Sequence, residues 1–143
     1  MDLARRPATA ADIPFLLDLR RKSMDQHLRA SGASVSEADH LDRLMHRFDC
    51  ADVLLQDGVP VGLLKVSRDG RDWTIIQIQL IPELQGQGLG ADILRQIIAE
   101  AVAADASLTL SVLKANPARL LYERLGFVVE SESEYEFNMR RVV

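Results

Sequence analysis

Three glycines at alternate positions follow an apolar run and precede a helical pattern of apolar residues. The segment 85–90 reads Gln-Gly-Gln-Gly-Leu-Gly. Glycine lets the backbone turn tightly and expose its N–H groups, and the first amides of a helix favour an anion such as pyrophosphate. The spacing is neither the Gly-x-Gly-x-x-Gly of a dinucleotide-binding fold nor a P-loop with Lys-Ser/Thr. The loop therefore predicts a phosphate-binding turn; the alternative is a tight strand-to-helix connection and nothing more.

A second segment with chemically useful side chains lies about thirty residues later. Residues 116–127 read Asn-Pro-Ala-Arg-Leu-Leu-Tyr-Glu-Arg-Leu-Gly-Phe. Together the two segments resemble the GNAT superfamily of N-acetyltransferases, in which Gln/Arg-x-x-Gly-x-Gly/Ala holds the coenzyme A pyrophosphate and an Asn…Leu-Tyr-Glu…Gly-Phe segment follows. The matching positions are Gln85, Gly88 and Gly90 in the first motif and Asn116, Leu121, Tyr122, Gly126 and Phe127 in the second. The Asn-to-Tyr step is six residues here and seven in many members.

The resemblance implies where acetyl-CoA, the acyl-donor co-substrate, would bind. The implied coenzyme-binding residues are Leu80, Ile81, Gln85, Gly86, Gln87, Gly88, Leu89, Gly90, Ala91, Asn116, Arg119 and Tyr122. In the family, the pantetheine arm lies between two splayed parallel strands and pairs with amides at the end of the earlier one, here those of Leu80 and Ile81. A bulge near residues 79–81 would free these amides. The alternative is that Pro82 simply ends the strand.

Tyr122 matches the position of the family's general acid, which protonates the departing thiolate. A phenol of pKa about 10 can serve a thiol of about 8.5 when the thiolate is desolvated or the phenol is acidified. Tyr122 also shares a helical face with Ala118, Leu121 and Leu125, so a packing role is the alternative. Asn116 would bind the pantetheine amides, cap the following helix, or do both.

The general base is not identified by the sequence. Gln77 and Gln79 stand on the strand where several family members place an acidic residue, and neither accepts a proton usefully. The remaining candidates are Glu83, His40, Asp42, His46 and an ordered water held by the glutamines. The missing carboxylate favours a non-catalytic acyl-CoA-binding module, whereas Tyr122 and Asn116 favour an enzyme that uses direct attack of an amine in a ternary complex.

The acceptor amine is not identified either. The resemblance implies a groove bordered by the first two helices and the last strands, with Arg20, Arg21, Met24, His27, Leu28 and residues 134–138 as its borders. Glutamates at 130, 132, 134 and 136 would share one face of an extended strand and attract a cationic amine, or be solvated at a hairpin tip, which we favour. The formal net charge of -4 also favours a cationic acceptor.

Length and composition limit the other classes of protein. The chain has 143 residues, 48% of them hydrophobic, which predicts one domain over residues 1–143. The acidic balance disfavours nucleic-acid binding, and the single cysteine, Cys50, excludes an internal disulfide and predicts a small core residue. His40 and His46 face different directions on one helix, so we expect no metal. We also expect no signal peptide, no membrane span, a cytoplasmic location, and a monomer or homodimer.

Apolar periodicity and turn residues predict the elements that position these residues. We expect helices over about 13–28, 37–49, 88–104 and 117–125, and strands over about 2–6, 51–56, 59–68, 72–81, 108–112, 127–130 and 135–139. Asp-Gly at 57–58 and 69–70 predicts two hairpins, and a right-handed crossover predicts that strands 72–81 and 108–112 are parallel. The fold class is therefore α/β (α+β): a single GNAT-like domain with a mixed central sheet of about six to seven strands, about four flanking helices and a splayed parallel strand pair.

Overall fold

The computed structural model of the chain describes residues 3–142. The strands are β1 (Ala4–Pro7), β2 (Ala51–Gln56), β3 (Val59–Asp69), β4 (Asp72–Leu80), β5 (Ser107–Leu113), β6 (Val128–Glu132) and β7 (Glu136–Arg141). The helices are α1 (Ile13–Ser31), α2 (Glu37–Met45), α3 (Leu89–Ala103) and α4 (Ala118–Arg124). The predicted order of elements is confirmed; position 2 of the predicted first strand lies outside the described residues. Within residues 3–142, none of the helices combines the length and apolar composition that a membrane span needs.

The strands form one sheet of seven in the order β1-β2-β3-β4-β5-β7-β6. The pair β4–β5 is parallel, and the other neighbouring strands are antiparallel. At the turn between β2 and β3, Asp57 and Gly58 have φ of 52° and 80°, as a type I′ hairpin requires. The mixed sheet, the four helices and the single parallel pair therefore confirm the predicted fold class.

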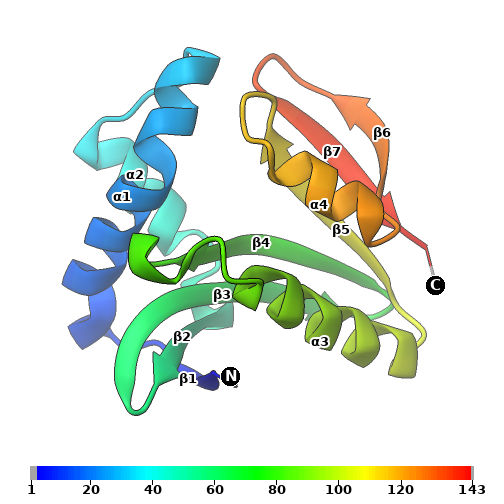
Figure 1. Ribbon diagram of the computed structural model, residues 1–143, viewed down its shortest axis with the longest axis horizontal. Helices are drawn as coiled ribbons and strands as arrows, with labels where there is room; N and C mark the ends of the chain where they lie inside the picture. Colours follow the sequence, from blue (N-terminus) through cyan, green and yellow to red (C-terminus); the bar gives the residue numbers. More distant parts are fainter. Residues whose placement is uncertain (1–2, 143) are drawn as a thin grey trace.

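The helices cover both faces of the sheet (Figure 1). On one face, α1 and α2 bury Leu16, Leu19 and Leu44 against Leu63 of β3. On the other face, α3 and α4 pack over a larger core, whose fully buried members include Leu64, Leu94, Ile97, Leu108, Phe127 and Met139. Helix α1 also contacts the end of β4, where the Ser23 hydroxyl donates to the Leu80 carbonyl at 3.3 Å.

A β-bulge lies in the middle of β4. Lys65 of β3 pairs with Gln77 and Val66 pairs with Ile75, so Ile76 is the extra residue. The predicted bulge near residues 79–81 was therefore wrong, since Leu80 still pairs in register with Gly62. A bulge reverses the alternation of side chains along a strand, and it does so here at the point where β4 leaves β5.

The reversal decides which side chains of β4 reach each face of the sheet. Before the bulge, Trp73 and Ile75 belong to the core under α3, and after it Ile78 and Leu80 take over that face. Gln77 and Gln79 are thereby turned to the opposite face, beneath α1 and α2. The bulge therefore makes the side-chain amides of Gln77 and Gln79 face the space between the helices and β5.

The parallel ladder between β4 and β5 is short. It runs from the Asp72–Ser107 pair to the Ile75–Leu110 pair, and the hydroxyls of Thr74 and Thr109 hydrogen bond across it at 3.0 Å. Beyond Ile75, β4 stays paired with β3 while β5 stays paired with β7. The two strands diverge as Figure 1 shows, and the predicted splayed pair is confirmed.

Helix α2 ends at Met45, four residues before the predicted end near Asp49. The side chain of Lys65 explains this end, because its Nζ donates to the carbonyls of Leu44 and His46 at 2.7 Å each and to that of Arg43 at 3.3 Å. A cation at the C-terminus of a helix satisfies its unpaired carbonyls and complements its dipole.

The chain then turns through Arg47, whose φ is 50°. Cys50 lies in the next turn, Phe48–Cys50, where it is half-buried and its Sγ accepts from Arg47 at 3.2 Å. The prediction of a core cysteine was therefore wrong.

Burial of Lys65 predicts the direction in which the stability of the fold changes with pH. The side chain is fully buried, and desolvation lowers the pKa of Lys65 to about 8, below the unfolded value of about 10.4. Between these values the unfolded chain binds one proton more, so stability rises with pH. We expect the unfolding free energy of the wild type, relative to Lys65→Met, to increase by about 2 kcal/mol from pH 8 to pH 10.

Urea unfolding of both proteins across this pH range measures the difference. Lys65→Met also removes the N–H donors of the amine, two of which remain when it is neutral, from the carbonyls at the end of α2, so it should be the less stable protein at pH 10. A difference that stays constant or shrinks with rising pH would contradict the assignment.

Candidate active site

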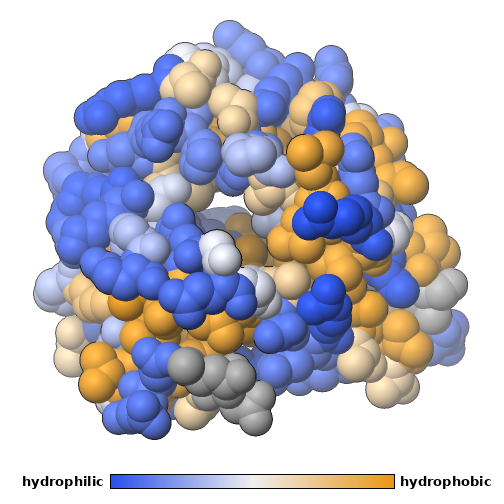
Figure 2. Space-filling view, in the orientation of Figure 1, coloured by the Kyte–Doolittle hydropathy of each residue, from blue (hydrophilic) through white to orange (hydrophobic). Residues whose placement is uncertain are grey.

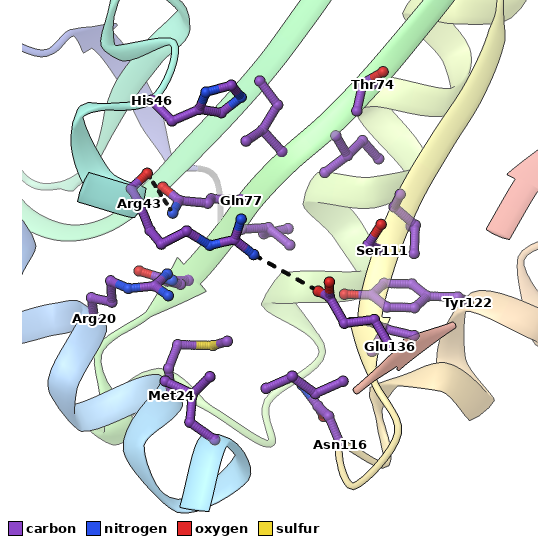
Figure 3. Close-up of a pocket in the computed structure, with 18 residues that line it drawn as sticks. Arg20, Met24, Arg43, His46, Thr74, Gln77, Ser111, Asn116, Tyr122 and Glu136 are labelled. Atoms are coloured by element: carbon purple, nitrogen blue, oxygen red, sulfur yellow. Dashed lines mark hydrogen bonds and ion pairs between the residues drawn. The ribbon is translucent and has the colours of Figure 1, made fainter. Parts of the chain in front are cut away.

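A cavity of about 290 Å³ lies where β4 and β5 diverge. Its walls come from α1, α2, the bulged half of β4, the end of β5, α4 and the start of β7. Figure 2 shows the molecule hollowed at this place, and Figure 3 shows the side chains that enter the cavity from the two sides. The splay therefore creates a pocket in the middle of the sheet that no hairpin or helix fills.

Tyr122 of α4 lines this cavity from the β5 side. Its ring packs edge-on against Phe127, with the centroids 6.1 Å apart. Within residues 3–142, no hydrogen-bond partner holds the Tyr122 hydroxyl. Burial raises the pKa of Tyr122 above its ordinary value of 10, so the phenol keeps its proton at neutral pH. The arrangement suits a proton donor as well as a packing residue.

The glycine segment forms the start of α3. Gly86 and Gly88 have φ of 77° and 81°, conformations that side chains other than glycine's adopt with strain. The Asp92 amide donates to the Gly88 carbonyl at 3.1 Å, so the amides of Leu89, Gly90 and Ala91 precede the first intrahelical bond and point out of the helix end. The loop therefore presents three donors in one direction.

Two glutamine side chains hold this loop in place. Gln85 Nε2 donates to the Leu80 carbonyl at 3.0 Å, and Gln87 Nε2 donates to the Glu83 carbonyl at 3.0 Å. The side chains of Gln85 and Gln87 thus anchor the turn between β4 and α3. The backbone amides are the groups left to meet a ligand.

Gly90 tests whether a phosphate group fits this place. Its φ is not positive, and a Cβ at Gly90 would meet no protein atom within 4 Å. Neither backbone conformation nor packing in the described chain therefore requires glycine here. Close approach of a ligand to the helix amides does require it, so the loop fits the pyrophosphate of a coenzyme.

Of the backbone amides of Leu80 and Ile81 at the end of β4, only one is available to bind a ligand. The Ile81 amide donates to the Val61 carbonyl of β3 at 2.9 Å, so the expectation that it would be free was wrong. Because amide directions alternate in an antiparallel ladder, the Leu80 N–H points the other way, toward the opening beside β5. Leu80 is therefore the residue of this pair that can pair with an extended ligand.

Asn116 and Arg119 stand at the start of α4. Asn116 lines the cavity, and its Oδ1 accepts from the Ala118 amide at 2.9 Å, so it holds the first turn of the helix as anticipated. Arg119 lies over the Phe137 ring at 4.9 Å and contacts Glu123 at 3.4 Å, away from the residues that line the cavity. Its assignment to the coenzyme phosphates stays a prediction.

The candidate general bases separate by position. His46 lines the cavity, whereas Glu83, Asp42 and His40 do not. His40 is 1% exposed, with Nδ1 accepting from Arg20 Nε at 3.0 Å and Nε2 at 2.7 Å from the Asp25 carboxylate. Both ring nitrogens of His40 are therefore engaged, and the ring joins α1 to α2.

Gln77 and Gln79 also line the cavity. Gln77 Nε2 donates to the Arg43 carbonyl at 3.3 Å. Within the described residues, the Oε1 atoms of both glutamines are buried without a hydrogen-bond partner. An unsatisfied buried acceptor is costly, so the two amides are prepared to accept from a water or from an N–H group of a ligand.

The acceptor groove is formed by part of the expected set. Arg20, Met24 and Leu28 of α1 and Glu136 of β7 line the cavity, whereas Arg21 and His27 do not. The other glutamates of the run lie on the solvated β6–β7 hairpin, as favoured from the sequence. Their contacts are Glu130 with Arg140 at 3.2 Å and Glu132 with Lys114 at 3.4 Å.

Arg43 of α2 was not among the site residues predicted from the sequence. Its guanidinium lies 4.0 Å from the Glu136 carboxylate across the cavity (Figure 3). Nothing in the local sequence separates Arg43 from a surface arginine. Within residues 3–142, His, Cys and carboxylate side chains do not gather in a group of three that could hold a metal ion.

Solved structures with this fold are numerous. PaiA N-acetyltransferase from Thermoplasma acidophilum, solved with coenzyme A, is 17% identical with a TM-score of 0.75, and the match covers 100% of both chains. The ribosomal-protein-S18-alanine N-acetyltransferase from Escherichia coli is 20% identical with a TM-score of 0.71, over 98% of this chain and 93% of that one. An acetyltransferase from Thermus thermophilus is 21% identical with a TM-score of 0.76, over 98% and 96%.

These identities show the fold, and a family model gives the family. No curated protein matches the chain. The model described as an acetyltransferase (GNAT) domain matches residues 24–143, which include the glycine loop, α4 and the cavity lining apart from Arg20. The chain therefore belongs to the GNAT family of acetyltransferases.

Proposed function

We propose that this protein is an acetyl-CoA-dependent N-acetyltransferase that acts by direct attack of an amine in a ternary complex. The observation that carries the proposal is the Tyr122 hydroxyl, which lines the cavity at the β4–β5 opening and has no partner within residues 3–142. The glycine loop lies at the far end of the same β4 strand. We propose that one extended ligand runs from the anion site at the glycine loop to the proton donor in the cavity.

Each group of the chain has one task in this proposal. Acetyl-CoA supplies an acyl group activated as a thioester. The amides of Leu89, Gly90 and Ala91 hold its pyrophosphate, and the Leu80 amide pairs with its extended arm. Tyr122 keeps a proton for the sulfur that departs, because burial raises the pKa of the phenol. Cys50 lies outside the cavity, so the chain offers no cysteine for a covalent acyl intermediate there.

The acceptor must lose a proton before it attacks. An α-amine of pKa about 8 costs about 1.4 kcal/mol to deprotonate at pH 7, whereas an alkylamine of about 10.4 costs about 4.6 kcal/mol. His46 is the one of the four base candidates that lines the cavity, and the Glu136 carboxylate lies on the opposite wall (Figure 3). Gln77 and Gln79 add two free carbonyl oxygens that can hold a water between the amine and these groups.

A non-catalytic acyl-CoA-binding module is the second candidate function. Gln77 and Gln79 favour it, because neither of these positions on β4 supplies a carboxylate that could act as a base in the cavity. Such a module would bind the coenzyme through the same loop. Turnover therefore discriminates the two functions, and coenzyme binding does not.

The test is to incubate the protein with acetyl-CoA and a panel of amino acids, other small amines, peptides and polyamines. We expect free thiol to appear only when an acceptor is present, with an acetylated product of matching mass. Thiol release without an amine serves as the control for hydrolysis. Tight acetyl-CoA binding by calorimetry with no transfer to any acceptor would replace the enzyme with the module, and no binding would reject both.

A further inference from the structure

Arg20 is a buried arginine at the wall of the cavity. Its residue is 6% exposed, and it extends from α1 toward β4 (Figure 3). Its Nε donates to Nδ1 of the His40 ring at 3.0 Å. Within the described part of the chain, its terminal nitrogens have neither a hydrogen-bond partner nor a carboxylate within 4.0 Å. Four of its five N–H donors are thus unassigned.

A buried guanidinium without a counter-ion is unfavourable. Removing an unpaired ion from water carries a desolvation penalty. The carboxylates of Asp25 and Glu136 reduce this cost through space, but neither lies within 4.0 Å of the guanidinium, and that of Asp25 contacts His40 Nε2 at 2.7 Å. Burial and the nearby Arg43 lower the pKa of Arg20 to about 10, so the group remains charged at neutral pH. Arg20 is therefore a fixed cation that no carboxylate within residues 3–142 contacts directly.

Arg43 places a second guanidinium on the same side of the cavity. It extends from α2, and its only carboxylate neighbour within the described residues is Glu136 at 4.0 Å. The charged side chains that line the cavity are therefore two arginines and one glutamate. The cavity has an excess of positive charge although the whole chain carries -4.

We infer that Arg20 and Arg43 bind a carboxylate of the acceptor, so that the acceptor is a small amine that also carries a carboxylate, as an amino acid does. Arginine is the side chain best suited to a carboxylate because its donors can engage both oxygens. The unpartnered Oε1 atoms of Gln77 and Gln79 lie on β4 within the same cavity and accept from the amine. This inference rests on the proposed function and adds the class of substrate.

The same geometry disfavours a polyamine. A second cationic group would lie near two guanidinium groups, and the largely buried Arg20 would repel it more than the solvated Arg43 would. The net charge and the glutamate run led us to expect a cationic acceptor. The charged side chains inside the cavity disfavour one. Glu130 and Glu132 are occupied by Arg140 and Lys114 on the outer hairpin.

The first experiment compares each standard L-amino acid with its carboxamide as an acceptor. The carboxamide keeps the amine and the side chain and removes one negative charge. We expect KM to be at least about tenfold lower for the free acid of the preferred amino acid. Arg43→Gln should raise that KM about tenfold and leave the KM of the carboxamide and of acetyl-CoA unchanged. The Arg43 side chain is 62% exposed, so its replacement should leave the fold intact.

Arg21→Gln is the matched control. Arg21 is the neighbour of Arg20 on α1, lies outside the cavity lining and contacts Glu37 at 2.7 Å. Its replacement removes one positive charge from the same helix without touching the cavity. Arg20→Gln is also informative, with circular dichroism to establish that the contact between α1 and α2 through His40 survives.

A binding measurement separates this inference from the proposed function. CoA-saturated protein is titrated by calorimetry with N-acetyl-amino acids and with their carboxamides. The carboxylate site is supported if the acids bind more tightly than the carboxamides and Arg43→Gln abolishes this difference. This result would hold even if the protein showed no turnover and the proposed function were rejected. The inference would be overturned by any of three results: acid and amide are used and bound equally, neither binds, or a polyamine is the best acceptor. Transfer to those other amines would leave the acetyltransferase proposal standing.

Discussion

Gly88→Val is expected to raise the dissociation constant of coenzyme A at least about 30-fold while the fold is retained. Gly88 is the residue before α3, with φ of 81° and no protein atom within 4 Å of the position of a Cβ. A valine there has room in the free protein, but it shifts the backbone away from φ 81° and occupies the space in front of the helix amides. Isothermal titration with coenzyme A measures the effect.

Gly58→Val controls for the strain of the substitution. Gly58 has φ of 80° and is equally open, but it lies in the β2–β3 hairpin turn. Both substitutions put a β-branched residue where the native φ is left-handed, so each should cost about 1–2 kcal/mol of stability, as strain or as the backbone shift that relieves it. Only Gly88→Val should lose coenzyme affinity. Unchanged binding by Gly88→Val, or an equal loss in both variants, would reject the pyrophosphate site.

The order of elements was predictable because each element has a local signal. Asp57 and Gly58 predict a hairpin, and the apolar spacing of residues 89–102 predicts α3. The bulge at Ile76 has only a weak local signal: the apolar positions change phase from 73 and 75 to 78 and 80 across the Ile75-Ile76 pair, but two adjacent isoleucines also occur in regular strands. The early end of α2 was also hidden, since it depends on Lys65, which is about twenty residues away in the sequence.

The candidate site was predictable where it depends on backbone and motif, and less so where it depends on packing. The glycine loop and Tyr122 stand in short segments with fixed spacing. Arg20 and Arg43 lie on separate helices and come together only through the fold. One signal existed for Arg20: it follows Leu16 by four residues, so both lie on one helical face, and Leu16 is fully buried.

Tyr122→Phe is expected to lower kcat about 100-fold and to leave the affinity for acetyl-CoA within about threefold of the wild type. The substitution removes one hydroxyl and keeps the ring that packs against Phe127, so the fold and the cavity shape persist. Loss of a proton donor acts on the departing thiolate and not on ground-state binding. Initial rates of thiol release at saturating acetyl-CoA and acceptor measure kcat, and the chain's other tyrosine, Tyr135, supplies Tyr135→Phe as the control because it does not line the cavity.

The pH profile distinguishes proton donation from packing. Because burial raises the pKa of Tyr122, the phenol stays protonated over the range in which the acceptor amine loses its proton, and the wild-type rate should rise with pH through that range. Tyr122→Phe should keep the rising part at a rate about 100-fold lower, since the amine still titrates. A kcat within about threefold of the wild type, or a fall of the wild-type rate near pH 8, would show that the phenol is not the acid. The ring of Tyr122 would then only line the cavity, and solvent would protonate the thiolate.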